Sequence, residues 1–129
     1  MRTIGVVIVV IVPESARRTY DNWHFAPAVQ HDGLIFFSGV VGSGDSAEEE
    51  FRDAWASLGE TLDAAGVGYE DIIDTTIYMV ELQKNTAAMA KVKDEFIKAP
   101  YPASTWIGIT ELVIPGARAE IKVIARKPK

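Results

Sequence analysis

The segment from Ser46 to Gly66 constrains this chain most, because its apolar residues fall on one face of a helix. They recur at steps of four, three, four and three, as Phe51, Trp55, Leu58, Leu62 and Ala65, which is the period of an amphipathic helix. Ser46 and Glu49 match a capping box at its start, and Gly66 is a natural C-terminal stop. A helix with a single apolar stripe must cover another layer of structure.

Short runs rich in Val, Ile and Thr indicate strands on both sides of this helix. They lie at residues 4–12, 28–30, 34–41, 71–81, 103–109 and 119–126. A second one-sided helix is predicted to begin at Asn85 or Thr86 and to end at Pro100. The predicted order is β-β-β-α-β-α-β-β, and we expect an α+β fold in which a mixed sheet carries two helices on one face. The length predicts a single domain spanning residues 1–129.

The connections between these elements are of three kinds. His31-Asp32-Gly33 predicts a β-hairpin, and Pro115-Gly116 marks a turn before the last strand. Residues 14–25 are expected to be irregular. The apolar run at 4–12 is predicted to be a buried strand, because nine residues are too few for a membrane-spanning helix and no cleavage site of a signal peptide follows them.

The predicted strands carry more apolar side chains than two helices on one face would cover. These residues are Leu34, Phe36, Ile77, Met79, Ile107, Ile109, Ile121 and Val123. Apolar residues on both faces of a sheet imply that something else covers the second face, most simply another copy of the chain. We therefore expect a closed homo-oligomer.

Composition excludes several classes of function. The chain has no cysteine and two histidines, so we predict no disulfide, no thiol nucleophile and no metal site. The net charge of −5 argues against a nucleic-acid partner, and no membrane partner is expected. The stretch at residues 39–45 fits neither the phosphate-loop nor the dinucleotide glycine spacing, and we expect no cofactor. The lack of cysteine suits a reducing cytosol, so a cytoplasmic protein is expected.

Glu120 is a carboxylate on an otherwise apolar last strand. By alternation it shares a face with Lys122. One interpretation is a surface charge paired with Lys122 or Arg118. The other is a general base or a water-activating group in a pocket. In the preceding strand, alternation places Ser104 and Trp106 on one face and Thr105 on the other.

Two further sites have both a structural and a functional interpretation. His24, next to Phe25, is either a hydrogen-bonding residue of the fold or a catalytic group. Ser38-Gly39 either permits a turn or exposes a backbone group to a ligand. Ser38 and Ser104 lack a pattern of His and Asp partners, so a serine-hydrolase triad is not expected.

Four segments of the chain form a combination that is more specific than any one of them. They read FAPAVQHDGLIFFSGV (25–40), LDAAGVGYEDIIDTTIYMV (62–80), YPASTWIGI (101–109) and AEIKVIAR (119–126). In this order and spacing they resemble the RidA/YjgF family of small enamine/imine deaminases, from about residue 13 onward. The resemblance implies a chorismate-mutase-like α+β domain, a homotrimer in which three sheets form a barrel, and small-molecule sites in the clefts between subunits.

The resemblance also implies a set of site residues. The water-activating glutamate of the family is retained as Glu120, and the glycine of its S-G pair is retained as Gly39. The family's tyrosine falls on Phe25. The arginine that holds the substrate's carboxylate falls on Ser104, so that Thr105 and Trp106 follow it.

Other positions depart from the family pattern. Its asparagine in the second helix falls on Ala90, and the second glutamate of its E-I-E motif on Lys122. Trp106 replaces a small residue and is expected to narrow the cleft or to line it with an aromatic ring. Arg17, Arg18 and His24 are further candidates for polar contacts.

Three functions remain open from the sequence. The first is a Rid-type hydrolase of a reactive imine, an enamine or a related small metabolite, in which Glu120 positions water; whether the chain is an enzyme is not decided by the residues alone. The second is a non-catalytic trimer that binds a small molecule. The third is a ribonuclease or translational effector, which the acidic charge disfavours most.

Overall fold

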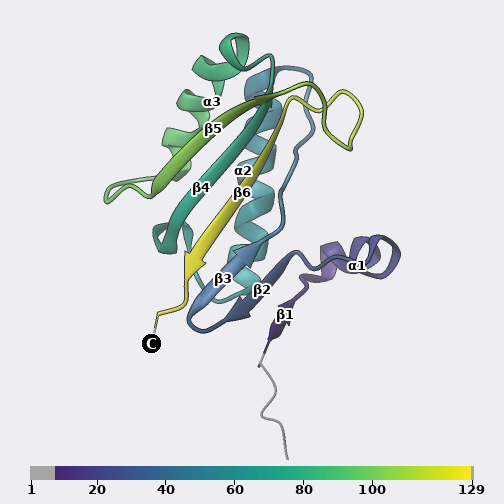
Figure 1. Cartoon of the computed structure of the whole chain (residues 1–129), viewed down its shortest axis with the longest axis vertical. Helices are drawn as coiled ribbons and strands as arrows, with labels where there is room; N and C mark the ends of the chain where they lie inside the picture. The colour runs from purple at the N-terminus through teal and green to yellow at the C-terminus, as the bar shows by residue number, and fades with distance from the viewer. Residues whose placement is uncertain (1–7, 129) are drawn as a thin grey trace, which may run out of the picture.

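The computed structural model of the chain describes residues 8–128 and contains one six-stranded sheet, shown in Figure 1. Its strands, in the spatial order β1-β2-β3-β6-β4-β5, are Val9–Ile11, Ala28–His31, Leu34–Phe37, Ala119–Arg126, Ile72–Val80 and Ala103–Ile109. β4 and β5 are parallel, and the other neighbours are antiparallel. The expected α+β fold with a mixed sheet is confirmed.

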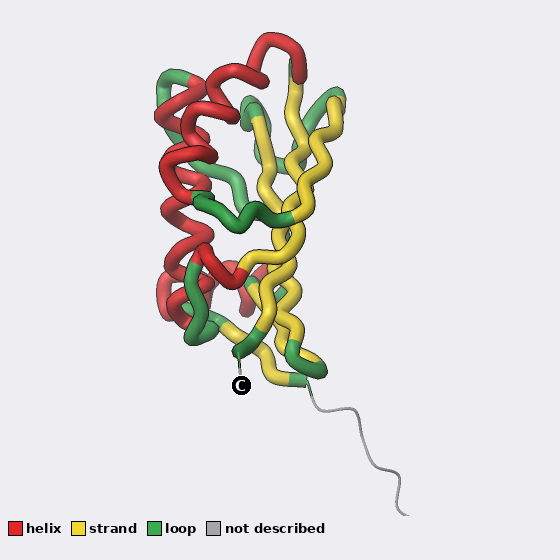
Figure 2. Tube along the Cα trace, turned by 90° about the vertical axis from the view of Figure 1, so that its left-hand side faces the viewer, coloured by secondary structure: helices red, strands yellow, loops and turns green. Residues whose placement is uncertain are grey.

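Two long helices, α2 (Ala47–Ala64) and α3 (Leu82–Phe96), form a layer on one face of the sheet, as the side view in Figure 2 shows. α2 begins as predicted, because the Ser46 hydroxyl accepts the backbone N–H of Glu49 at 3.1 Å. The capping differs in one respect: the Glu49 carboxylate accepts the Ser46 hydroxyl, at 3.0 Å. At the other end Gly66 adopts φ +77°, which is the left-handed conformation of a helix stop.

The main core lies between this helix layer and the sheet. The predicted stripe of α2 is buried, with Phe51, Trp55, Leu58 and Leu62 at most 1% exposed. The sheet contributes fully buried residues from four strands: Ala28, Ile35, Phe37, Ile77, Met79, Ile121, Val123 and Ala125. Each large side chain buried in this way contributes about 1.5–3 kcal/mol, so the core accounts for the orientation of α2 and α3.

α3 begins earlier than predicted. The helix starts at Leu82, directly after Glu81, which takes a left-handed φ of +49° and reverses the chain from β4. Asn85 therefore lies inside the helix, where its Nδ2 donates to the carbonyl of Val80 at 2.7 Å. The prediction of an N-cap at Asn85 or Thr86 is wrong. The asparagine side chain instead donates a hydrogen bond to the last carbonyl of the strand, and does not accept one from the first N–H groups of the helix. The helix ends at Phe96 rather than at Pro100.

The N-terminal part of the chain differs from the prediction in two ways. The segment expected to be irregular contains a 3-10 turn, η1 (Glu14–Ala16), and a helix, α1 (Arg17–Trp23), visible in Figure 1. Neither has a buried residue, so no apolar period marks them in the sequence. The first strand is not buried: it is the edge strand β1, in which Val9 and Val10 are each 47% exposed. Residues 4–7 of the predicted strand lie outside the described residues.

The predicted hairpin forms between β2 and β3. Its two turn residues, Asp32 and Gly33, both have positive φ, +50° and +76°, as a tight hairpin turn requires. β3 ends at Phe37, and the chain then approaches β6 once more at Val40. Val40 and Ile121 exchange two backbone hydrogen bonds, of 2.8 and 2.9 Å. This bridge fixes the segment after β3 against β6.

The second face of the sheet carries no helix layer, as Figure 2 shows. We call this surface the open face. The prediction of apolar side chains on this face is confirmed in part: Phe36 and Ile107 are 42% and 39% exposed there. Four of the residues named for it, Ile77, Met79, Ile121 and Val123, are instead buried in the core beneath the helices. Within residues 8–128, no helix has the length and apolar character needed to cross a membrane.

Candidate functional site

Strand alternation on β6 places Glu120 on the open face. Its neighbours Ala119 and Ile121 point into the core and are at most 1% exposed, whereas Glu120 is half-buried. Tyr78 of β4 lies opposite Glu120 in the sheet register. The carboxylate therefore projects from a rigid central strand rather than from a loop.

Gly39 packs directly against this carboxylate. A Cβ built on Gly39 would lie 2.4 Å from Cδ of Glu120 and 2.7 Å from its Oε2. The segment is held by its neighbour Ser38, whose hydroxyl donates to the carbonyl of Ala26 at 2.6 Å. The backbone N–H of Ser38 also donates to the carbonyl of Pro27, at 2.9 Å. Glycine at position 39 thus makes room for the side chain of Glu120.

The Glu120 side chain faces a pocket of about 510 Å³. Its lining residues are Thr19, Trp23, Phe25, Val41, Val113, Ile114 and Glu120. Glu120 is the one charged side chain among them, and it makes no hydrogen bond or ion pair with any residue that the structure describes. We refer to this hollow as the Glu120 pocket. The structure thus brings together three of the predicted site residues: Phe25, Gly39 and Glu120.

The predicted site residues of β5 lie elsewhere. Trp106 turns toward the helix-covered face, where it packs against the core, and its Nε1 donates to the Ser104 hydroxyl at 2.9 Å. Thr105 points to the open face, in register with Thr76 and Lys122. Within one chain, Ser104 and Trp106 are therefore separated from Glu120 by the sheet, and a cleft shared by these residues requires a second copy.

Basic residues occur near the Glu120 pocket but do not line it, and two of them contact other groups of the chain. The guanidinium of Arg17 lies 5.3 Å from the ring centroid of Tyr20, and Nζ of Lys122 donates to the carbonyl of Phe37 at 3.2 Å. His24 ends α1 in a left-handed conformation, with φ +60°. None of these three side chains, nor that of Arg18, lines the pocket.

Sequence reasoning missed the apolar wall of the pocket. Thr19 and Trp23 belong to α1, which was not predicted, and Val113 and Ile114 lie in the loop between β5 and β6. The four-residue spacing of Thr19 and Trp23 is that of one helix face. This spacing is the one sequence pattern that indicated these pocket residues. A single pair of residues four apart, with no buried apolar residue beside it, is too weak a pattern to predict a helix.

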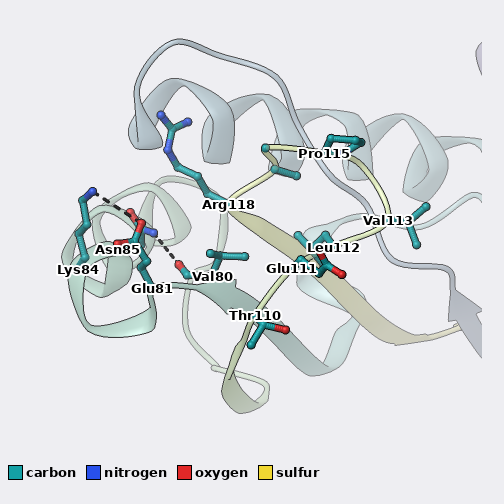
Figure 3. Close-up of a pocket in the computed structure, with 12 residues that line it drawn as sticks. Val80, Glu81, Lys84, Asn85, Thr110, Glu111, Leu112, Val113, Pro115 and Arg118 are labelled. Carbon is teal, nitrogen blue, oxygen red and sulfur yellow. Dashed lines mark hydrogen bonds and ion pairs between the residues drawn. The ribbon is translucent and has the colours of Figure 1, made fainter.

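A larger hollow, of about 730 Å³, lies at the end of β4 and the start of α3. Lys84 and Arg118, both labelled in Figure 3, are among the residues that line it. Arg118 is engaged by the buried Glu50, with 2.8 Å between Nη1 and Oε1. No predicted site residue lines this hollow. Within residues 8–128, no group of three or more His, Asp or Glu side chains is arranged to hold a metal ion.

Comparison with known proteins identifies relatives of this chain. The family model described as Endoribonuclease L-PSP matches residues 17–127. RutC family protein YjgH of Escherichia coli (strain K12) is 34% identical over 126 residues, which cover 92% of this chain and 95% of that protein. The human 2-iminobutanoate/2-iminopropanoate deaminase is 27% identical over 110 residues, or 78% of each chain.

Solved structures show the same fold. Protein YJGH has a TM-score of 0.85 at 33% identity, covering 94% of this chain and 97% of its own. NMB1025 of Neisseria meningitidis, described as a member of the YjgF protein family, has a TM-score of 0.81 at 28% identity, covering 96% and 98%. These matches confirm the expected chorismate-mutase-like architecture. The chain belongs to the RidA/YjgF family, whose members the Endoribonuclease L-PSP model describes.

Proposed function

We propose that the protein is a deaminase that hydrolyses a reactive imine or enamine, with Glu120 positioning and deprotonating the attacking water. The observation that carries this proposal is the carboxylate of Glu120, which has no partner among the described residues and faces a pocket. Relatives of this chain, including the human protein, are named as deaminases of 2-iminobutanoate and 2-iminopropanoate. Both observations fit hydrolysis of a C=N bond.

The reaction needs little from the protein beyond a base and a place for the substrate. Glu120 takes a proton from water while the oxygen bonds to the imine carbon and the C=N electron pair moves to nitrogen. The same carboxyl then returns the proton to nitrogen, the hydroxyl proton passes to nitrogen as the C–N bond breaks, and ammonia and a carbonyl compound leave. A positioned general base of this kind contributes about 10²–10⁴-fold to a rate.

Each working site is proposed to lie between two copies of a homotrimer. Within one chain the sheet separates Ser104 and Trp106 from Glu120. The open face is apolar where Phe36 and Ile107 are exposed, and a monomer in water would leave that surface uncovered. Association of copies through the open face would cover it, and would place β5 of one copy near the Glu120 pocket of the next.

The test replaces Glu120 by Gln, which keeps the shape and removes the base. We expect ammonia release from enzymatically generated imines to fall about 100-fold or more in kcat/KM, with the melting temperature little changed. Glu111→Gln, at an exposed loop position outside the Glu120 pocket, is the matched control and should retain the wild-type rate. Wild-type turnover by the Glu120→Gln variant on every imine would refute the catalytic role.

A second candidate function is a binding trimer without catalysis. The observation that favours it is the lack of a hydroxyl at Phe25 and of a cation among the pocket residues, because both would help to hold and polarise an imino acid. This alternative predicts that metabolites raise the melting temperature in proportion to occupancy while no imine is turned over. Measured turnover without any thermal shift would exclude it.

The description of the matching family model names an endoribonuclease, and RNA is the least favoured ligand. The chain has a net charge of −5, and the Glu120 pocket has a carboxylate and no basic side chain among its lining residues. Binding of RNA normally depends on basic residues that contact phosphates and weakens with added salt. Absence of any salt-sensitive RNA binding would exclude a function that acts on RNA.

A further inference from the structure

The Glu120 pocket has an unusual balance of charge and apolar surface. Five of its seven lining residues are apolar or aromatic: Trp23, Phe25, Val41, Val113 and Ile114. The two rings are accessible to a ligand, since Trp23 is 68% and Phe25 44% exposed. The single charge is negative, because the remaining lining residues are Thr19 and Glu120. The pocket thus combines an aromatic wall with one carboxylate.

The basic side chains two residues before and two residues after Glu120 are held by other groups of the chain. Arg118 contacts the Glu50 carboxylate at 2.8 Å and the carbonyl of Asp45 at 3.1 Å. Lys122 donates to the carbonyl of Phe37. Neither side chain lines the pocket. An anionic group that entered would therefore meet the charge of Glu120 without a compensating cation among the residues that line the pocket.

A positively charged group would be attracted to the pocket. A positive group near Glu120 gains an ion pair with an oxygen that has no other described partner. The faces of Trp23 and Phe25 attract cations as well, most strongly where water is excluded. The apolar side chains of Val41, Val113 and Ile114 would then cover the uncharged part of the ligand.

We propose that the Glu120 pocket selects a substrate cation that carries an apolar or aromatic group and no carboxylate, namely the protonated imine that oxidation of an alkyl or arylalkyl amine yields. This inference rests on the proposed function of the site and narrows its substrate class. It separates this protein's substrate from imino acids, in which a carboxylate is bonded to the reacting carbon.

The balanced reaction is R₂C=NH₂⁺ + H₂O → R₂C=O + NH₄⁺. Water gives a proton to Glu120 as its oxygen bonds to carbon, and the C=N electron pair neutralises the nitrogen. Glu120 then returns the proton to nitrogen, the C–N bond breaks, and the hydroxyl proton leaves with ammonia as ammonium. No oxidant, reductant or metal takes part in the balance. The carboxylate is negative when the iminium binds, so charge attraction acts at the start of the reaction.

The test uses two substrates that differ by one carboxylate. An amine oxidase acting on phenethylamine generates the carboxylate-free imine, and an amino acid oxidase acting on phenylalanine generates the corresponding imino acid. Acceleration of hydrolysis above the uncatalysed rate is measured for both imines. We expect kcat/KM to be at least tenfold higher for the carboxylate-free imine. Equal rates, or a preference for the imino acid, would overturn the inference and leave the proposed deaminase function intact.

Binding of the unreactive amines separates the two proposals. By titration calorimetry, phenethylammonium is expected to bind at least tenfold more tightly than phenylalanine, and Glu120→Gln to remove this preference while Glu111→Gln keeps it. A binding preference without turnover of either imine would uphold the ligand class and refute the deaminase. Equal or absent binding of the two amines would overturn the ligand class.

A gain of function completes the test. Val113 is 83% exposed at the pocket, so an arginine there has room and is not expected to disturb folding. Val113→Arg supplies the missing cation and should reduce the preference for the carboxylate-free imine at least tenfold, whereas Gln83→Arg, which adds the same charge at an exposed position outside the pocket, should retain it. An unchanged preference in Val113→Arg, with the protein folded, would count against charge as the basis of selection.

Discussion

The Glu120 carboxyl occupies the space that a Cβ at position 39 would need. Gly39 does not have a positive φ, unlike Gly33 and Gly66, so the requirement for glycine is one of space and not of backbone conformation. The same pair explains how a carboxylate on a central strand stays open to a pocket: the chain beside it has no side chain that would cover it.

We therefore expect Gly39→Ala to reduce kcat/KM for imine hydrolysis at least tenfold. The new Cβ would lie 2.4 Å from Cδ of Glu120, which forces the carboxyl to move, and small displacements of a reacting group are costly. The melting temperature should change little, because the far end of a side chain yields easily. Gly108→Ala on β5, where the new Cβ meets Leu82 at 3.3 Å, is the control. Full activity of Gly39→Ala would contradict the role of Gly39.

At the scale of the elements, α2 covers the sheet and also holds the start of β6 through Glu50. Glu50 on this helix is 3% exposed and accepts the backbone N–H of Arg118 at 2.7 Å as well as its guanidinium at 2.8 Å. Arg118 immediately precedes β6, so the helix ties down the start of the strand that carries Glu120. The link between helix and site is thus a buried, hydrogen-bonded ion pair.

Glu50→Ala is expected to lower the free energy of unfolding by about 3 kcal/mol, because it leaves a partly buried guanidinium without its carboxylate. Urea unfolding at neutral pH measures this change. Glu48→Ala, which removes an exposed pair with Lys91 at 3.1 Å, should cost at most about 1 kcal/mol. A smaller effect for Glu50→Ala than for Glu48→Ala would show that the buried pair does not stabilise the fold.

Tyr69 in the short turn η2 (Tyr69–Asp71) is hydrogen-bonded to the middle of α2. Its hydroxyl donates to the carbonyl of Trp55 at 2.6 Å, and burial raises the pKa of the phenol above its ordinary value of 10.0. Since the pKa is higher in the folded chain, the unfolded chain loses this proton first as the pH rises. The contribution of Tyr69 to stability is complete below about pH 10 and is lost as the pH rises through the folded-state pKa.

Tyr69→Phe should therefore be less stable than the wild type by about 1 kcal/mol near pH 7, the usual net value of a hydrogen bond. This difference should shrink as the pH rises above about 10, since Phe has no proton to lose. Urea unfolding of both proteins at about pH 7, 9 and 11 measures the trend. Tyr101→Phe, at a position that is 73% exposed, serves as the control. A difference that stays constant with pH would contradict the assignment.

At the scale of the whole molecule, residues of the proposed site lie on opposite faces of one sheet. Glu120 and its pocket lie on the open side, and Trp106 lies on the helix-covered side of β5. Several exposed apolar residues, among them Phe36 and Ile107, remain without cover in one chain. We therefore expect the isolated subunit to leave apolar surface exposed and to lack part of the proposed site, and we expect the proposed trimer to supply both.

Light scattering coupled to gel filtration should accordingly give a mass of about 42 kDa, three times the chain mass of 14.1 kDa. Ile107→Glu places a charge on the open face and should shift the protein toward monomer with a loss of imine hydrolysis, because burial of an unpaired charge opposes association. Gln83→Glu, exposed on the helix side, should remain assembled and active. A monomeric wild type with full activity would refute the shared sites.

The sequence by itself determined the helix at 47–64, the hairpin at Asp32-Gly33 and the mixed sheet, because capping, turn conformation and apolar period act over a few neighbouring residues. It also singled out Phe25, Gly39 and Glu120. Only the tertiary structure decided that these three meet at one pocket, that α1 supplies part of its wall, and that Ser104 and Trp106 lie across the sheet. The reason is physical: α1 buries nothing within its own chain, and the site depends on contacts between segments distant in sequence, which no local pattern encodes.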